Sequence, residues 1–329
     1  MNNSHLIPYT APDSSSLSFS QKDLAPDSAG FTFVPKNTPP DDSFQLKIPP
    51  QSGRRFQIDK SAAVSMALLF IIILGLGCTC CRLFLSKDPA YMDLAHYNTA
   101  PCSEFPFGTD AVGRDIFSMI WYGGRISLFI GFAAAFISTV TAILFGTVSG
   151  LAPQWLDACL MRAAEILISI PNLLLVIFIQ AIWGKADLWS LSLIIGLTSW
   201  FGIAKVVRIQ VRRLRSSEYV IAARCMGGGF FHILRKHLAP NFVSSILFMA
   251  VMNIRNAIAA ESTLSFMGLG LPLEVISWGS MLSNADRSLL SGAWWIILIP
   301  GLFLIATLSS ITKIGNWLRI KNRRRDRIL

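Results

Sequence analysis

Residues 216–241 read SSEYVIAARCMGGGFFHILRKHLAPN, a polar and basic segment that separates two long apolar stretches. Its first part predicts a short helix over Ser217–Met226, with a face of small side chains that suits a helix lying flat in a partner's groove. Gly227–Gly229 then end this helix, because glycine adopts the backbone angles of a sharp turn. A second short helix is expected over Phe230–Leu238, with Pro240 in the first turn of the next apolar segment.

The composition places most of the chain in a membrane. Of the 329 residues, 53% are hydrophobic, and the mean hydropathy is +0.52, which is too apolar for an ordinary soluble domain. About 20 apolar residues cross a bilayer as a helix. Six apolar blocks therefore predict six transmembrane helices in an all-α membrane protein. They are Ser61–Cys81, Ile126–Leu156, Ile166–Gly184, Leu188–Ala204, the segment from Asn241 to Leu271, and Ser288–Thr312.

The placement of positive charge predicts the orientation. The formal net charge is +10, and Lys205–Pro240 holds eight Lys and Arg against one acid. The tail from Lys313 holds seven against one, whereas Arg82–Arg125 holds four basic and five acidic residues. Lys and Arg near span ends stay in the cytoplasm, so the segment before span five and both termini are expected there. Membrane orientation explains the basic charge, and no nucleic-acid partner is expected.

The first 58 residues differ in composition from the rest of the chain. They hold eight of the sixteen prolines and few large apolar residues, which predicts a disordered cytoplasmic tail. They do not fit a signal peptide, because the first apolar block comes late and has the length of a true span. The expected organisation is a tail over 1–58, a first transmembrane helix over 59–82, an external loop over 83–125, a five-helix core over 126–317 containing a loop over 205–240, and a basic tail over 318–329.

The 216–241 segment resembles the cytoplasmic loop of inner-membrane permeases in binding-protein-dependent ABC importers. The family pattern is Glu-Ala-Ala, three residues, Gly, nine residues, Ile, one residue, Leu-Pro. Ile221 stands at the Glu position, and Ala239 at the Leu position. His237 stands at the Ile position, as in the peptide-transport branch. The residues that match at the family spacing are Ala222, Ala223, Gly227 and Pro240.

Two further stretches resemble the oligopeptide, dipeptide and nickel permeases. The first comprises FPFGTD (105–110), GRD (113–115) and YGGRISL (122–128), and the second comprises ES (261–262), LSF (264–266), GLG (268–270) and WGSML (278–282). The chain is most similar to the C-type permease subunit of peptide importers, which has one span ahead of a five-span core. We expect residues 105–115 to form a loop clamp at the external edge, in preference to the alternative of substrate contact, with Arg114 and Asp115 pairing or bonding loop carbonyls.

The chain contains no GxxxxGK[S/T] loop for ATP and no catalytic constellation, so it is not expected to be an enzyme or to bind a cofactor. The resemblance implies ATP-Mg on two separate ATP-binding subunits, a second permease subunit in a heterodimer, an external substrate-binding protein and a bacterial inner membrane. The 217–226 helix would couple this chain to an ATP-binding subunit. The expected coupling residues are Glu218, Tyr219, Ala222, Ala223, Arg224 and Gly227.

Polar residues in the fifth span are candidates for the translocation path, because such residues usually face a bundle interior or a water-filled route. Asn253 and Asn256 are three residues apart and share a helix face, and Glu261 lies further along. These side chains could instead bond neighbouring helices, with Arg255 paired to Glu261. Two lesser expectations are an ion pair between Arg162 and Glu165 and helix kinks at Pro171 and Pro300.

Peptide import by one half of the translocation pathway is the function that the resemblance implies. Nickel is the alternative substrate within the same family. A self-sufficient secondary transporter is the alternative from another class, which would need intramembrane ionisable groups and often internal repeats. A disulfide from Cys102 to Cys80 or Cys81 is also left open.

Overall fold

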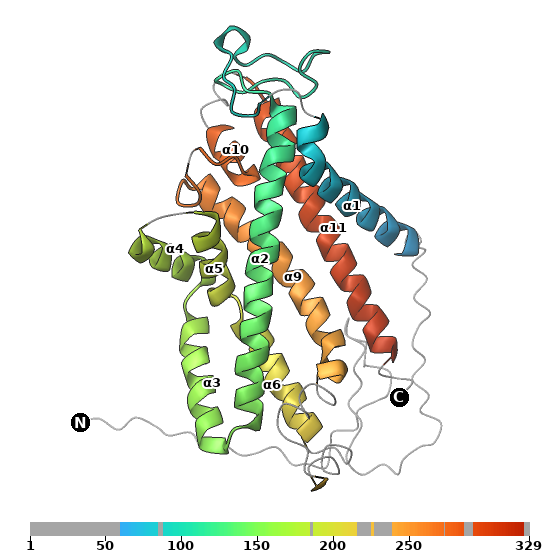
Figure 1. Cartoon of the computed structure of the whole chain (residues 1–329), viewed down its shortest axis with the longest axis vertical. Coiled ribbons are helices and arrows are strands. Elements are labelled where there is room, and N and C mark those ends of the chain that lie inside the picture. Colours follow the sequence, from blue (N-terminus) through green and yellow to red (C-terminus); the bar gives the residue numbers. More distant parts are fainter. Residues whose placement is uncertain are drawn as a thin grey trace, which may run out of the picture. The chain divides into compact units, whose positions relative to one another are not determined.

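The computed structural model of this chain describes residues 60–84, 88–184, 187–215, 225–226, 239–272, 274–285 and 292–325. These residues are helical, apart from loops and one isolated bridge between Thr109 and Asp115 (Figure 1). The α-helices are α1 (Lys60–Phe84), α2 (Ile116–Leu151), α3 (Gln154–Ser169), α4 (Asn172–Trp183), α5 (Leu188–Thr198), α6 (Phe201–Arg215), α9 (Ala239–Phe266), α10 (Trp278–Ala285) and α11 (Trp295–Arg325). The prediction of an all-α protein is confirmed for this part of the chain.

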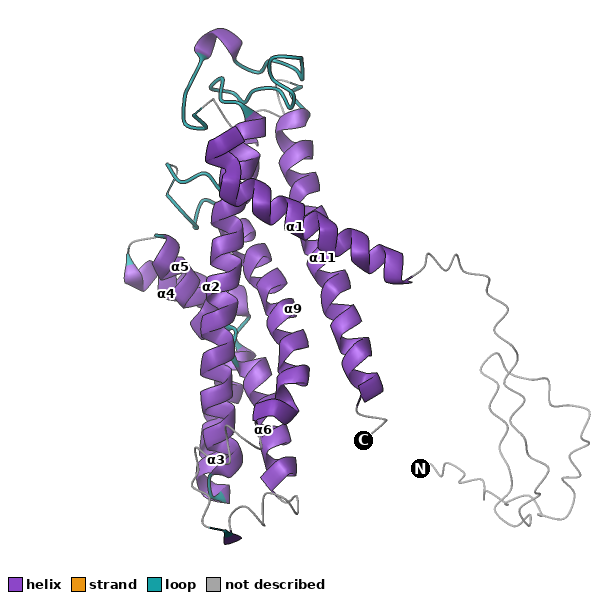
Figure 2. Cartoon of the chain, turned by 45° about the vertical axis from the view of Figure 1, so that its right-hand side comes forward, coloured by secondary structure: helices purple, strands orange, loops and turns teal. Residues whose placement is uncertain are grey.

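Helix α2 is the central helix of the bundle. It packs against α6, α9, α5 and α1, and α11 lies between α1 and α9 (Figures 1 and 2). Glycines let neighbouring backbones approach it. A Cβ at Gly146 would lie 2.6 Å from the Ala204 carbonyl oxygen, and one at Gly150 would lie 2.8 Å from Val211 Cγ1. The small residues of this span therefore serve close helix packing.

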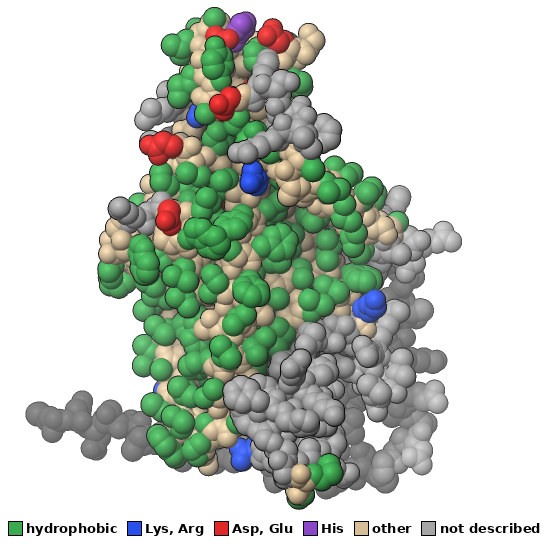
Figure 3. Space-filling model, in the orientation of Figure 1, with side chains coloured by type: hydrophobic (Ala, Val, Ile, Leu, Met, Phe, Trp, Pro, Cys, Tyr) green, Lys and Arg blue, Asp and Glu red, His purple; other side chains and the backbone are tan. Residues whose placement is uncertain are grey.

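Three helices among the described residues are long and apolar enough to cross a membrane: α1 over Ala62–Cys81, α2, and α11 over Trp295–Lys321. Two bent pairs, α3 with α4 and α5 with α6, raise the number to five if each pair is one span. Hydrophobic side chains cover the middle of the face drawn in Figure 3. The six-span count also requires α9, and it stays a prediction.

Helix α2 begins ten residues before the predicted start of the second span at Ile126. Asp115 caps it, because its carboxylate accepts hydrogen bonds from the backbone N–H of Phe117 and Ser118 at 3.3 and 3.1 Å. The predicted start was too late because Arg125 interrupts the apolar sequence. Arg125 nevertheless lies within the helix, with its side chain exposed. Residues 116–125 therefore belong to α2 and not to the preceding loop.

Prolines set the other boundaries that the hydropathy pattern misplaced. Helix α2 ends at Leu151 and not at Leu156, since Pro153 cannot continue it. The predicted span Ile166–Gly184 contains a 91° bend between α3 and α4 at Pro171. Ile170, directly before Pro171, is extended (φ −84°, ψ 130°), as a residue preceding proline prefers. The expected kink at Pro171 is confirmed, whereas α11 runs as one helix past Pro300.

Two further helices extend beyond their predicted ends. The predicted fourth span Leu188–Ala204 is bent by 46° between α5 and α6, and α6 continues to Arg215. The first residues of the expected loop 205–240 are therefore helical. Helix α11 runs from Trp295 to Arg325 instead of ending at Thr312, so it includes most of the predicted basic tail.

The loop before α2 is fastened to α11, as the clamp interpretation expects. Asp110 accepts hydrogen bonds from the backbone N–H of Val112 and Arg114, and its carboxylate pairs with the Arg114 side chain at 2.7 Å. Arg114 therefore pairs with Asp110, whereas Asp115 caps α2. Trp295 of α11 donates its indole N–H to the Thr109 carbonyl at 3.1 Å. Cys102 is a free, exposed thiol, so the disulfide alternative is not formed.

Candidate functional site

A cavity of about 330 Å³ lies where both helix breaks meet α9. At such breaks, main-chain N–H and C=O groups lose their helical hydrogen-bond partners. Inside a membrane, unpaired main-chain groups are tolerated only where they are buried in protein or face a water-filled space. The polar residues lining the cavity are Asn172, Thr198, Ser199, Asn253 and Asn256. The remaining lining is apolar apart from backbone: Leu167, Ile168, Ile170, Pro171, Leu175, Phe201 and Gly202.

Asn253 and Asn256 reach this cavity together, which agrees with their placement on one face of the helix. Asn253 is buried, and its amide donates to Ser138 Oγ of α2 at 2.6 Å. Asn256 is exposed, and its carbonyl oxygen accepts from the Arg255 guanidinium at 2.8 Å. Asn253 therefore both lines the cavity and joins α9 to α2, whereas Asn256 lines the cavity and contacts only its neighbour Arg255 among the hydrogen-bond partners in the described residues.

The ion pair considered for Arg255 and Glu261 is not formed. Residues six positions apart lie about 120° apart around a helix, and the Arg255 side chain turns to Asn256 instead. Its Nε is buried and has no hydrogen-bond partner in the described part of the chain. Arg255 and Glu261 therefore belong to separate polar environments.

Glu261 is fully buried and is held by hydroxyl groups. Ser127 of α2 donates to Oε2 at 2.9 Å, and Ser265 donates to Oε1 at 2.9 Å. Ser262 donates to Oε2 at 3.3 Å. We call Ser127, Ser262 and Ser265, which hold the Glu261 carboxyl group, the serine cage. Glu261 does not line the cavity described above, and its place on the translocation path remains a prediction.

The serine cage fixes the start of α10. Ser127 Oγ, which donates to Glu261, accepts the backbone N–H of Trp278 at 3.3 Å. The Trp278 side chain is fully buried and donates its indole N–H to the Ile120 carbonyl at 3.0 Å. Gly279 allows this approach, because a Cβ there would lie 2.7 Å from the Ser262 carbonyl oxygen. Glu261 thus joins α2, α9 and the segment that leads into α10.

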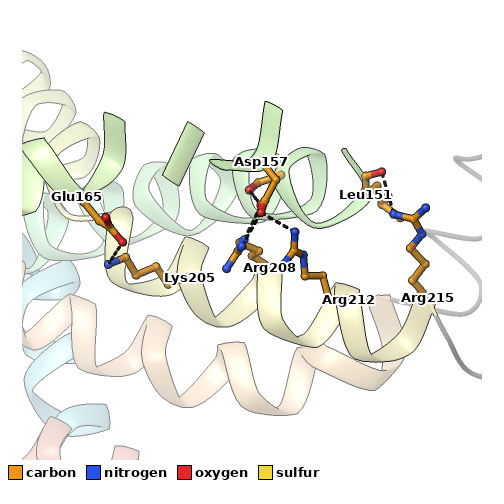
Figure 4. A network of polar contacts seen from close by, with 8 residues as sticks. Leu151, Asp157, Glu165, Lys205, Arg208, Arg212 and Arg215 are labelled. Atoms are coloured by element: carbon orange, nitrogen blue, oxygen red, sulfur yellow. Dashed lines mark hydrogen bonds and ion pairs between the residues drawn. The ribbon is translucent and has the colours of Figure 1, made fainter. Parts of the chain in front are cut away.

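A second buried carboxylate, Asp157 of α3, lies at the other end of α2 (Figure 4). Its side chain is 3% exposed and accepts from the Arg208 guanidinium through both oxygens and from Arg212, each at 2.5 Å. Ser149 of α2 also donates to it at 2.5 Å. We call these four residues the Asp157 clamp. It was not predicted from the sequence, where both arginines count only toward the basic charge that predicts membrane orientation.

Weaker polar contacts flank this clamp (Figure 4). Glu165 pairs with Arg162 at 3.2 Å, as predicted, and lies 3.8 Å from Lys205 of α6, with all three side chains substantially exposed. Arg215 donates to the Leu151 carbonyl at 3.3 Å.

The residues predicted to couple this chain to an ATPase lie outside the described residues. They are Glu218, Tyr219, Ala222, Ala223, Arg224 and Gly227, and their predicted role remains a prediction. Within the same loop, Cys225 and Met226 are described, and both are exposed. The nearest described helix upstream is α6, which ends at Arg215.

Long apolar helices, two bent helix pairs and a partly polar cavity at their breaks define a polytopic membrane protein. Comparison with known proteins identifies its kind: a model of the binding-protein-dependent transport system inner membrane component matches residues 142–319. The chain belongs to this family.

Curated relatives are similar over most of their length. The dipeptide transport system permease protein DppC of Bacillus subtilis is 36% identical over 261 residues, which are 79% of this chain and 81% of that protein. The oligopeptide transport system permease protein OppC of the same organism is 34% identical over 265 residues, 80% of this chain and 86% of that protein. A putative peptide permease protein of Brucella suis is 35% identical over 271 residues, 82% of this chain and 88% of that protein.

Proposed function

We propose that this chain is one membrane-spanning subunit of an ATP-driven, binding-protein-dependent importer of peptides, and that it forms half of the translocation pathway. The observation that carries the proposal is the cavity at the two helix breaks, which presents Asn253 and Asn256 beside apolar side chains. Amide groups can donate to and accept from a peptide backbone without requiring a charge. The names of the relatives support peptides as the substrate class.

The proposed complex contains this chain, a second permease subunit, two ATP-binding subunits that hydrolyse ATP-Mg, and an external binding protein that delivers the substrate. Because this chain belongs to a family of inner membrane components of binding-protein-dependent systems, ATP hydrolysis is assigned to the partners and not to this chain. A bacterial inner membrane is its proposed location.

Uptake by the reconstituted complex tests the function. Proteoliposomes that hold the complex should accumulate a labelled dipeptide or oligopeptide only with ATP inside and the binding protein outside. Uptake of Ni²⁺ without peptide uptake would favour the nickel alternative. Peptide uptake by this chain alone, driven by an ion gradient, would instead favour a secondary transporter.

The proposed orientation places both termini and the loop after α6 in the cytoplasm. Cys102 and Cys225 are both exposed, which makes them suitable reporters in variants that retain one cysteine each. An impermeant thiol reagent added to intact cells should label Cys102 and leave Cys225 unlabelled until the membrane is opened. Labelling of Cys225 from outside would contradict this orientation.

Coupling is proposed to run through the loop that contains Glu218, Tyr219, Ala222, Ala223, Arg224 and Gly227. Gly227→Val should misplace the preceding helix if the predicted turn gives Gly227 a positive φ, because a β-branched residue resists such an angle at a cost of about 1–3 kcal/mol. Peptide uptake and retention of the ATP-binding subunits should fall, while the amount in the membrane stays normal. Cys225→Ser is the matched control. Normal uptake by the Gly227 variant would contradict this coupling assignment.

A further inference from the structure

The Asp157 clamp has features that membrane orientation does not explain. Positive residues near a span end need only reach the cytoplasmic side, yet Arg208 and Arg212 turn inward to one carboxylate. Asp157 is 3% exposed, and Arg208 is 23% exposed. Removing such a carboxylate from water is costly unless charged donors compensate for the lost solvation. The three donors therefore act together to hold one defined arrangement of α2, α3 and α6.

The clamp lies between the cavity and Arg215, the last residue of α6, which the predicted coupling loop follows in the sequence. Helix α3 ends at the cavity, where Leu167 and Ile168 line it, and α6 begins there with Phe201 and Gly202. Further along, α6 carries Arg208 at its middle and Arg212 in its last turn, before the helix ends at Arg215. Asp157 thus joins α3 and α6 at the end away from the cavity.

Close backbone packing supports the same arrangement. Gly150 of α2 lies against the turn of α6 that carries the clamp, since a Cβ at this glycine would lie 3.1 Å from the Arg208 carbonyl oxygen. Ser149, the neighbouring residue, donates to Asp157 at 2.5 Å. The clamped end of α6 is therefore held by α2 and by α3.

We propose that Asp157 is a positioning residue that makes α3 and the last turns of α6 one rigid unit. This inference rests on the proposed function. A displacement applied to the segment after Arg215 then moves both helices that line the cavity. Without the clamp, part of the displacement is lost by movement of α6 relative to α3.

The first test measures how many ATP molecules the complex hydrolyses for each peptide imported. Asp157→Asn should raise this ratio by roughly tenfold, within the range known for residues that transmit coupling, while the ATP-binding subunits remain bound. Asp157→Glu, which keeps the charge, should restore most of the coupling. Glu165→Gln removes an exposed carboxylate that also faces α6, and should leave the ratio unchanged.

If Asp157→Asn does not assemble, Arg212→Gln provides the second variant. Arg212 is 43% exposed, so its loss should weaken the clamp and raise the ratio without preventing folding. An unchanged ratio in the assembled variants would overturn the proposal. An equal rise in Glu165→Gln would overturn it too, because any lost carboxylate on α3 would then have the same effect.

A second measurement is independent of the cargo. Spin labels at Cys159 on α3 and at Ile209→Cys on α6, both exposed positions, report the separation of the two helices in the full complex. The background lacks the other five cysteines. The distance distribution should be narrow with Asp157 and clearly broader with Asp157→Asn. Equal widths would overturn the clamp even if the complex imports peptides, whereas the expected broadening without peptide import would contradict only the proposed function.

Discussion

Two buried carboxylates in opposite halves of α2 are held by different chemistry. Glu261 accepts from Ser127 of α2, and Asp157 accepts from Ser149 of the same helix. These serines are about 33 Å apart along the helix axis. The other donors to Glu261 are hydroxyl groups, whereas those to Asp157 are two guanidinium groups.

The serine cage and the Asp157 clamp therefore differ in how they respond when the helices that they join move. Serine hydroxyls are short and neutral, and each can donate or accept, so the serine cage is a compact joint that carries no positive charge into an apolar region. The arginines of the Asp157 clamp are long, and Arg212 is 43% exposed. Water can therefore reach Arg212, whereas the better-buried pair of Asp157 and Arg208 keeps α3 and α6 together.

Glu261→Ala should produce the largest effect. It leaves the Ser127 and Ser265 hydroxyls without their acceptor and opens a cavity between α2, α9 and α10, at a cost of about 2–4 kcal/mol. Thermal unfolding of the purified complex and the amount recovered from membranes should both fall. Glu274→Ala, at an exposed position, is the control and should change neither. Equal behaviour of the two variants would show that the serine cage does not support the fold.

Asp157→Asn should have an intermediate effect on stability. It leaves two guanidinium groups facing an uncharged amide, but Arg212 can turn to solvent, so we expect a loss of about 1–3 kcal/mol. Because Asp157 and Arg208 act together, Asp157→Asn combined with Arg208→Gln should cost less than the sum of the two single changes. Chemical denaturation of the four variants measures this. Strict additivity would mean that the buried pair contributes no coupling energy.

The sequence predicted the long apolar helices because their signal is local. It also predicted the kink at Pro171, since proline acts on its own helix. The start of α2 was placed too late because Arg125, a charged residue inside the helix, interrupts the apolar sequence. The true start is set by the cap Asp115, ten residues earlier. Capping is decided by one side chain and does not alter hydropathy.

The buried polar sites could be predicted only in part. Asn253 and Asn256 were found because their shared face follows from helix periodicity. The partners of the carboxylates were not found, since Ser127 is 134 residues from Glu261 and Arg208 is 51 residues from Asp157. Only packing of separate helices brings such residues together.

Glu261→Gln should have the smallest effect and gives the sharpest test of the comparison. Glutamine has nearly the same shape as glutamate, and the hydroxyls of Ser127 and Ser265 can rotate to accept from its NH₂ group. We therefore expect a loss of less than about 1 kcal/mol, compared by thermal unfolding with Glu261→Ala. The matching change at Asp157 has only a partial remedy, because Ser149 can accept from the asparagine NH₂ group, whereas the guanidinium donors cannot accept. If Glu261→Gln lowered the stability as much as Glu261→Ala, the serine cage would require a charged carboxylate. Both buried sites would then depend on the negative charge and not only on hydrogen bonds.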